Sequence, residues 1–178
     1  MAADSSDEPV VDEPVVDEPV AMRIKGLMLD PSSNTPIVIL RDEAERLFLP
    51  IWIGVFEANA IAMELEDARV PRPMTHDLFH NTLAAVQVTL ERVVIRDLQD
   101  NTFFAVLRLS SGGKAFEIDA RPSDALALAL RAGAPIFVLS SVLAKAEAID
   151  LVQRIQDEDE LKRWLADVDP DELGKYPM

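Results

Sequence analysis

Four polar side chains with chemical potential stand close together in the second half of the sequence. Asp119, Arg121, Ser123 and Asp124 lie within six consecutive positions that also contain Ala120 and Pro122. Carboxylates accept hydrogen bonds and bind cations, whereas the planar guanidinium of an arginine can hold a phosphate through two hydrogen bonds. Arg121 can instead pair with Asp119 or Asp124 and fasten this segment. The sequence leaves both roles open.

The neighbouring residues predict a strand that turns directly into a helix. Apolar and acidic residues alternate over 116–119, which is the period of a half-buried strand. Pro122 suits the first turn of a helix, and Ser123 or Asp124 is expected to cap it. Alternating alanine and leucine residues continue the helix until Gly133. The small alanines would let this helix lie close against a sheet.

The same plan occurs earlier in the chain at a constant offset of 67 residues. Glu57 corresponds to Asp124, and each acid is followed by Ala-x-Ala-apolar-Ala. We interpret this as an internal duplication. If the two halves pack about a pseudo-twofold axis, Glu57 and Asp124 approach one another. Alternatively, each acid only caps its own helix.

Both histidines of the chain lie in one expected helix, from His76 to about Val86, with Thr75 as its N-cap. His76 could act as a general acid or base, or bind a metal. His80 lies four residues on, which places the two rings on one helix face. The glutamate of a His-Glu-x-x-His motif is absent, so a solvated helix start is the alternative.

Composition limits the classes of protein that fit. The 178 residues are 49% hydrophobic and contain no cysteine, which excludes disulfides, a thiol nucleophile and cysteine-based metal sites. The net charge of −15 argues against tight non-specific binding to nucleic acid. No signal peptide or apolar stretch long enough to span a membrane is evident, so we expect a cytoplasmic protein.

Three segments are expected. Residues 1–21 hold two Asp-Glu-Pro-Val-Val repeats and a truncated third, which predicts a disordered acidic tail. Residues 22–151 predict one α+β domain, with a mixed or antiparallel sheet packed by helices, and residues 152–178 predict a helical extension carrying Trp164. The expected strands are 23–29, 37–40, 47–53, 88–98, 103–109, 115–120 and 136–139, and the expected helices are 57–65, 76–86, 122–130 and 142–155.

Four blocks of sequence resemble the bifunctional nuclease family, in the order expected and over about residues 22–150. They are Lys25-Gly26-Leu27 with Asp30-Pro31, Leu49-Pro50-Ile51-Trp52-Ile53-Gly54-Val55-Phe56-Glu57-Ala58, Arg72-Pro73-Met74-Thr75-His76-Asp77-Leu78, and Asp119-Ala120-Arg121-Pro122-Ser123-Asp124-Ala125. The resemblance implies an α+β fold built from a duplicated unit and a nuclease activity on both RNA and DNA.

A metal-assisted nuclease of low sequence preference needs carboxylates that hold Mg²⁺ or Mn²⁺. Asp119, Asp124 and Glu57 are the candidate ligands, and Arg121 and His76 are the further candidates for catalysis. The alternative is a non-catalytic module that binds a small ligand or a protein partner at the same corner. Because an open sheet edge needs covering, a homo-oligomer is expected in either case.

Overall fold

The computed structural model describes residues 17–31, 33–68 and 70–146, and within them the chain forms a seven-stranded mixed sheet and four helices. The predicted α+β class is confirmed. The strands are β1 (Pro19–Leu29), β2 (Pro36–Asp42), β3 (Phe48–Trp52), β4 (Thr89–Gln99), β5 (Thr102–Ser111), β6 (Lys114–Ala120) and β7 (Ile136–Leu139). The helices are α1 (Val55–Leu65), α2 (Thr75–Ala85), α3 (Pro122–Ala132) and α4 (Ser140–Lys145).

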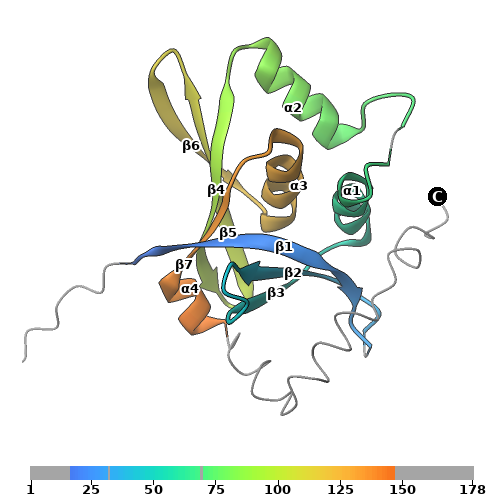
Figure 1. Cartoon of the computed structure of the whole chain (residues 1–178), viewed down its shortest axis with the longest axis vertical. Helices are drawn as coiled ribbons and strands as arrows, with labels where there is room; N and C mark the ends of the chain where they lie inside the picture. The colour runs from blue at the N-terminus through green and yellow to red at the C-terminus, as the bar shows by residue number, and fades with distance from the viewer. Residues whose placement is uncertain (1–16, 32, 69, 147–178) are drawn as a thin grey trace, which may run out of the picture.

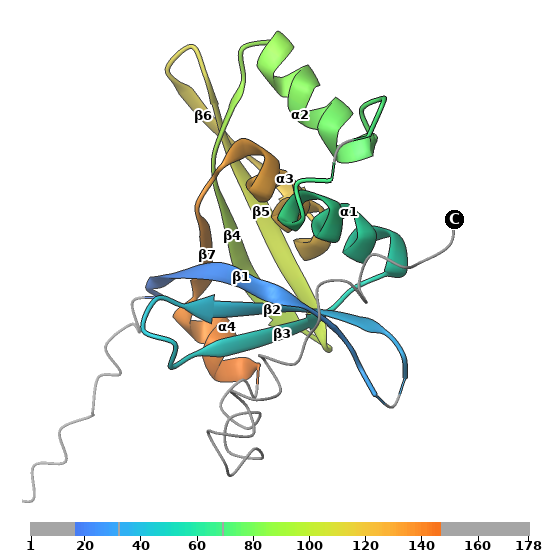
Figure 2. The same cartoon turned by 45° about the vertical axis from the view of Figure 1, so that its right-hand side comes forward.

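The order of the strands, β3-β2-β1-β7-β4-β5-β6, is nearly symmetric about β7. Strands β1 to β3 form one antiparallel meander that leads into α1, and β4 to β6 form a second that leads into α3. Strand β7 joins them, antiparallel to β1 and parallel to β4. Figures 1 and 2 show the two meanders as separate halves of one strongly twisted sheet. This arrangement supports the duplication inferred from the sequence.

Helix α3 lies at the centre of the molecule, between the other long helices and the sheet (Figure 1). Its residues Ala125–Ala129 are all buried, because small alanines alternate with leucines that fill the space against the strands. Arg121 is its N-cap and Pro122 its first residue. The helix ends as predicted at Gly133, whose φ of 62° places it in the left-handed region.

The two faces of the sheet differ. Side chains such as Leu40, Val93 and Leu107 point into the core that includes α3, and the residues that alternate with them point to the other side. We call that other side the outer face. In the N-terminal half it holds a separate small cluster of Ile37, Ile39 and Phe48.

Several expected boundaries differ from the structure. Strand β1 begins at Pro19 rather than at the expected Arg23, and its residues 19–22 pair with β7. Helix α2 is capped at Met74, not Thr75, since the Asp77 carboxylate accepts the Met74 N–H at 2.7 Å. Helix α4 runs over Ser140–Lys145, beginning two residues before the expected Val142, and residues 147–155 of the expected helix lie outside the described residues. The extension with Trp164 and the tail before residue 17 lie outside the described residues.

Trp52 shows how an edge residue can be exposed and still bonded. It alternates with buried Ile51 and Ile53, and its side chain is on the outer face, where its indole N–H donates to the Asp30 carboxylate at 3.0 Å.

No helix of the described residues is long and apolar enough to cross a membrane.

Candidate active site

Arg121 connects the two halves of the molecule. Its Nε and Nη2 donate to the two carboxylate oxygens of Asp124 at 2.7 and 3.1 Å, and its Nη1 lies 2.9 Å from Glu57 Oε1. Glu57 and Asp124 are each the third residue of their helices, so the duplicated acids meet at one guanidinium. The expected approach of these two carboxylates is therefore seen.

Neither acid serves as a side-chain cap of its own helix. No side-chain capping bond is present at Gly54 or Arg121, the N-caps of α1 and α3. A methyl group at Gly54 would overlap the Glu57 carboxylate, so the glycine leaves room for Glu57 to reach Arg121. The simple capping alternative, including the expected cap by Ser123 or Asp124, is wrong for these positions.

His76 completes the cluster from a third helix. Its Nε2 lies 3.0 Å from Asp124 Oδ1, and its side chain is 15% exposed. Burial raises the pKa of Asp124, but hydrogen bonds from Arg121 and His76 and the charges of both groups outweigh it, so its pKa lies below the usual value. Asp124 is therefore ionised at neutral pH and can orient the imidazole ring.

A second arginine positions the helix that carries His76. The Arg131 side chain is 6% exposed, and its Nε lies 2.5 Å from Asp77 Oδ1 on α2. Its Nη1 donates to the backbone carbonyls of Ala127 on α3 and Ala60 on α1, at 2.9 and 3.2 Å. The hydrogen bond from Arg131 is the main reason that the pKa of Asp77 is lowered. Arg131 therefore joins α1, α2 and α3 beneath the cluster.

These groups line an open pocket of about 400 Å³ between the three helices. The lining residues are Phe56, Glu57, Asn59, Ala60, Met63, Met74, Thr75, His76, Arg121, Asp124 and Arg131. Phe56 is 89% exposed and Met74 45%, so two large apolar side chains stand at the rim of a polar pocket. The volume lies in the range of small-molecule sites.

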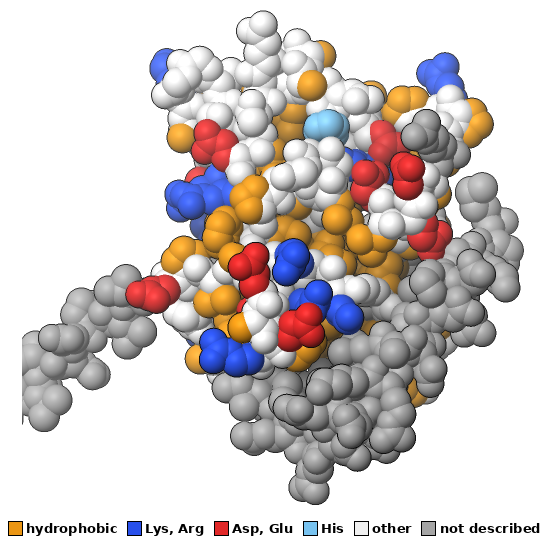
Figure 3. Space-filling view, in the orientation of Figure 1, with side chains coloured by type: hydrophobic (Ala, Val, Ile, Leu, Met, Phe, Trp, Pro, Cys, Tyr) orange, Lys and Arg blue, Asp and Glu red, His pale blue; other side chains and the backbone are white. Residues whose placement is uncertain are grey.

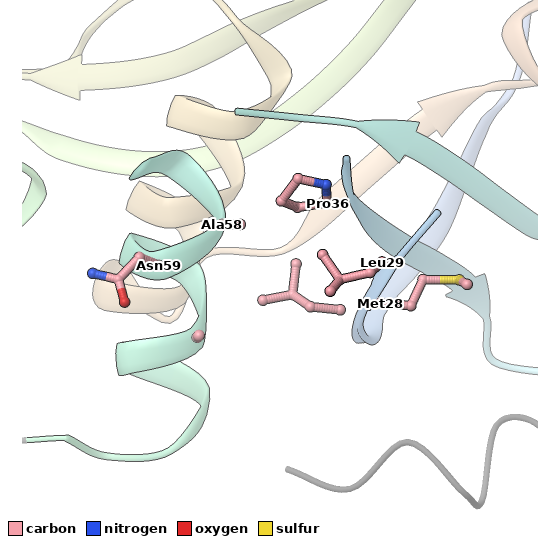
Figure 4. Close-up of a pocket in the computed structure, with 7 residues that line it drawn as sticks. Met28, Leu29, Pro36, Ala58 and Asn59 are labelled. Carbon is pink, nitrogen blue, oxygen red and sulfur yellow. The ribbon is translucent and has the colours of Figure 1, made fainter. Parts of the chain in front are cut away.

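A second cavity lies on the opposite side of α1, against the turn between β1 and β2 (Figure 4). Leu29, Pro36 and Ala58 line it, and its volume of about 10 Å³ is enough for one water molecule at most. Asn59 points away from it, out from α1 (Figure 4). This cavity is a packing gap.

Asp119 does not join the other predicted site residues. On β6 it is in register with Val106, which places its side chain on the outer face, away from α3. There it is 71% exposed and lies 3.6 Å from Arg96. Its expected role in catalysis or metal binding has no support from its position.

The expected metal ligands do not fit a divalent cation in this arrangement. Arg121 occupies both oxygens of Asp124 and one of Glu57, and Asp119 faces the other side of the sheet. In residues 17–31, 33–68 and 70–146 no group of three His, Asp or Glu side chains is placed to hold a metal, so the pairing of His76 with His80 has no support either.

Sequence reasoning missed Arg131 and Phe56. Arg131 reads as an ordinary basic residue in the last turn of a helix, although its position four residues after Ala127 puts it on the buried side. Phe56 lies between the expected strand 47–53 and the expected helix 57–65, and neither pattern marks it. The available signal for the apolar rim of the pocket was a large apolar residue two positions after Gly54, the N-cap of α1.

The fold and the pocket define a class: an α+β domain of two meander–helix units, with a charged pocket where their helices meet. A family model described as the bifunctional nuclease domain matches residues 38–150. Two proteins of Mycobacterium tuberculosis, Uncharacterized protein Rv1829 and Uncharacterized protein MT1877, are each 38% identical over an alignment of 161 residues that covers 85% of this chain and 96% of theirs.

A plant relative is more distant. Bifunctional nuclease 1 of Oryza sativa subsp. indica is 25% identical over an alignment of 112 residues that covers 61% of this chain and 34% of the rice protein. The chain belongs to the bifunctional nuclease domain family, and the resemblance seen in its sequence is confirmed.

Proposed function

We propose that the chain hydrolyses phosphodiester bonds of RNA and DNA with low sequence preference, in the pocket between α1, α2 and α3. The observation that carries the proposal is the contact between His76 and Asp124 beside Arg121, in a member of this family. A histidine that is oriented by a carboxylate can transfer a proton, and an arginine beside it can stabilise the charge on the phosphate; hydrolysis of a phosphodiester needs both functions.

His76 acts as the general base. When the ring donates its Nε2 proton to Asp124, its Nδ1 is free to accept a proton from water. The hydroxide attacks phosphorus, the bond from phosphorus to the leaving sugar oxygen breaks, and that oxygen takes a proton from a second water molecule. The imidazolium of His76 then returns its proton to the hydroxide that this second water leaves. Since DNA lacks the 2′-hydroxyl, a common site for RNA and DNA must use water as its nucleophile.

Arg121 binds the phosphate that is attacked. A guanidinium has five N–H donors, and the carboxylates of Asp124 and Glu57 take three of them. The side chain is 66% exposed, so the remaining donors can reach non-bridging oxygens of a phosphate. The charge that develops on these oxygens in the transition state strengthens the contact.

The apolar rim explains a low sequence preference. The ring of Phe56 can stack on any base, because every base has a π face, and stacking does not read the hydrogen-bonding edge. A nuclease that holds its substrate through phosphate contacts and stacking therefore cuts many sequences.

The test is cleavage of end-labelled single-stranded RNA and DNA by the purified full-length protein and two variants. Asp124→Asn keeps the shape of the side chain and removes the charge that orients His76, and Arg121→Ala removes the phosphate contact. We expect each change to lower kcat/KM at least 100-fold while circular dichroism stays unchanged. Full activity in both folded variants would contradict the proposal.

A binding module remains the second candidate function. The pocket has the volume of a small-ligand site, and its two arginines and apolar rim suit an anion with an apolar or aromatic part. A protein that shows no cleavage on any substrate, but binds nucleotides through Arg121, would favour this alternative.

A further inference from the structure

Two pairs of arginines face each other directly across neighbouring strands. Arg23 on β1 is in register with Arg41 on β2, and Arg92 on β4 is in register with Arg108 on β5. Arg41 and Arg108 are separated by 67 residues, the offset of the duplication. Each half of the molecule therefore contributes one arginine pair at a corresponding place.

The four arginines lie in one row across the outer face of the sheet. Their chain neighbours Met22, Leu40, Val93 and Leu107 point into the core, so the arginines point to the other side. Met22 and Val93 are both in register with Ile136 of β7, which brings the two pairs into line on either side of β7. We call Arg23, Arg41, Arg92 and Arg108 the arginine row. Crossing from β2 to β5, it covers about 20 Å of the sheet.

The charges of the row are only partly balanced. Arg41 pairs with Glu45, and Arg108 Nη2 lies 2.7 Å from Glu117 Oε1. In the part of the chain that the structure describes, Arg23 and Arg92 have no ion-pair partner, and the Arg92 guanidinium lies 6.0 Å from the centre of the Phe137 ring. Like charges directly opposite on a sheet are destabilising, so each pair costs folding stability.

We infer that the arginine row binds the phosphate backbone of a single-stranded nucleic acid that is the substrate of the pocket. The identity of the ligand rests on the proposed function, and the location of the surface rests on the register. A line of cations with an aromatic ring beside it matches a polyanion whose bases can stack on guanidinium planes and rings. The bases of a duplex are not free to make such contacts.

The row also leads toward the pocket. Arg108 contacts Glu117 on the edge strand β6, and Arg121 follows Glu117 by four residues, about 13 Å along an extended chain. Arg96 lies on the same side, 3.6 Å from Asp119. In Figure 3, basic side chains stand over β1 to β3 and beside β4 and β6, with acidic ones among them. The end of the row is therefore separated from the pocket by the short segment from Glu117 to Arg121.

The test is fluorescence anisotropy with a labelled 20-nucleotide single-stranded oligothymidine and the full-length chain. All proteins carry His76→Ala, so that the probe is not cut. One variant adds Arg23→Gln and Arg92→Gln. The matched control adds Arg72→Gln and Lys114→Gln, which change the net charge equally at exposed positions away from the row.

We expect the row variant to bind at least 10-fold more weakly, with a salt slope lower by about 2, while the control variant binds like its parent. Equal binding by the row variant, or an equal loss in the control, would overturn the inference, and so would equally tight binding of polyglutamate. The assay is independent of cleavage. If the wild-type chain cleaves no nucleic acid but the row variant still loses binding, only the proposed function is refuted. If the wild-type chain cleaves nucleic acid but the row variant binds like its parent, only this inference is refuted.

Discussion

At the scale of single residues, Arg121 is the side chain on which the proposed chemistry depends most. It pairs with two of the three carboxylates that the sequence offers as metal ligands, Glu57 and Asp124, and it lies beside His76, which contacts Asp124. The proposed mechanism therefore uses side chains alone for proton transfer and phosphate binding. Asp119, which would complete a metal site, is held on the other face by the alternation of the strand.

This arrangement makes a prediction about metal removal. Because Glu57, Asp124 and Asp119 do not fit a divalent cation together, we expect cleavage of labelled single-stranded DNA to continue at the same rate in excess EDTA. The comparison is with the same protein in Mg²⁺ or Mn²⁺. An activity that disappears in EDTA and returns on addition of either ion would show instead that the expected metal is required.

At the scale of the elements, the position of α2 depends on few contacts. None of its residues is buried, and the hydrogen bonds of Arg131 with Asp77 and with two backbone carbonyls hold its first turn against α1 and α3. His76 therefore stays near Asp124 because of a polar connection. We therefore expect the position of α2 to depend on the pH, which would not be so for a helix packed mainly by apolar contacts.

The lowered pKa of Asp77 gives the direction of this pH dependence. A carboxyl whose pKa is lower in the folded state stabilises the fold above its unfolded value, near 3.8, and the contribution is lost as the pH falls through the folded value. We expect Asp77→Asn to lower the free energy of unfolding by about 2 kcal/mol at pH 7.

Urea unfolding of both proteins between pH 7 and pH 2.5 measures this effect. The difference between wild type and Asp77→Asn should shrink steadily below pH 4, and Glu66→Gln, a change at the exposed C-cap residue of α1, serves as the control. A difference that is independent of pH would show that the charge of Asp77 does not hold α2.

At the scale of the whole molecule, no other described element covers the outer edge of β6 or the exposed side of α2. All but the last residue of β6 are exposed, including Phe116 at 40% and Ile118 at 48%. On α2, Leu78 is 60% exposed. Exposed apolar residues on a sheet edge are typical of an interface, so the expectation of a homo-oligomer stays a prediction.

Light scattering coupled to size-exclusion chromatography tests it. We expect a mass of at least two chains of 19.7 kDa for the wild type and a single chain for Ile118→Glu, with unchanged circular dichroism. Val55→Glu, a charge at an apolar position of similar exposure on α1, is the matched control. A wild-type protein of one chain at micromolar concentration would contradict the prediction.

Most of the fold can be predicted from the sequence, and so can the meeting of Glu57 and Asp124 in the site. Turn residues and alternation predict the seven strands, and the repeat at 67 residues predicts that Glu57 and Asp124 meet. The arginine row could not be predicted, because its members are far apart in sequence and come together only through the pairing with β7. Arg131 was missed for a related reason: burial of a charged residue depends on three helices at once.

The measurement that tests the central claim most directly compares the two histidines of one helix. Full-length wild type, His76→Ala and His80→Ala are assayed on labelled single-stranded RNA and DNA after identical purification. We predict that His76→Ala loses at least 100-fold in rate on both substrates, whereas His80→Ala keeps wild-type activity, because only His76 contacts Asp124. Equal activity of His76→Ala and wild type would contradict the account.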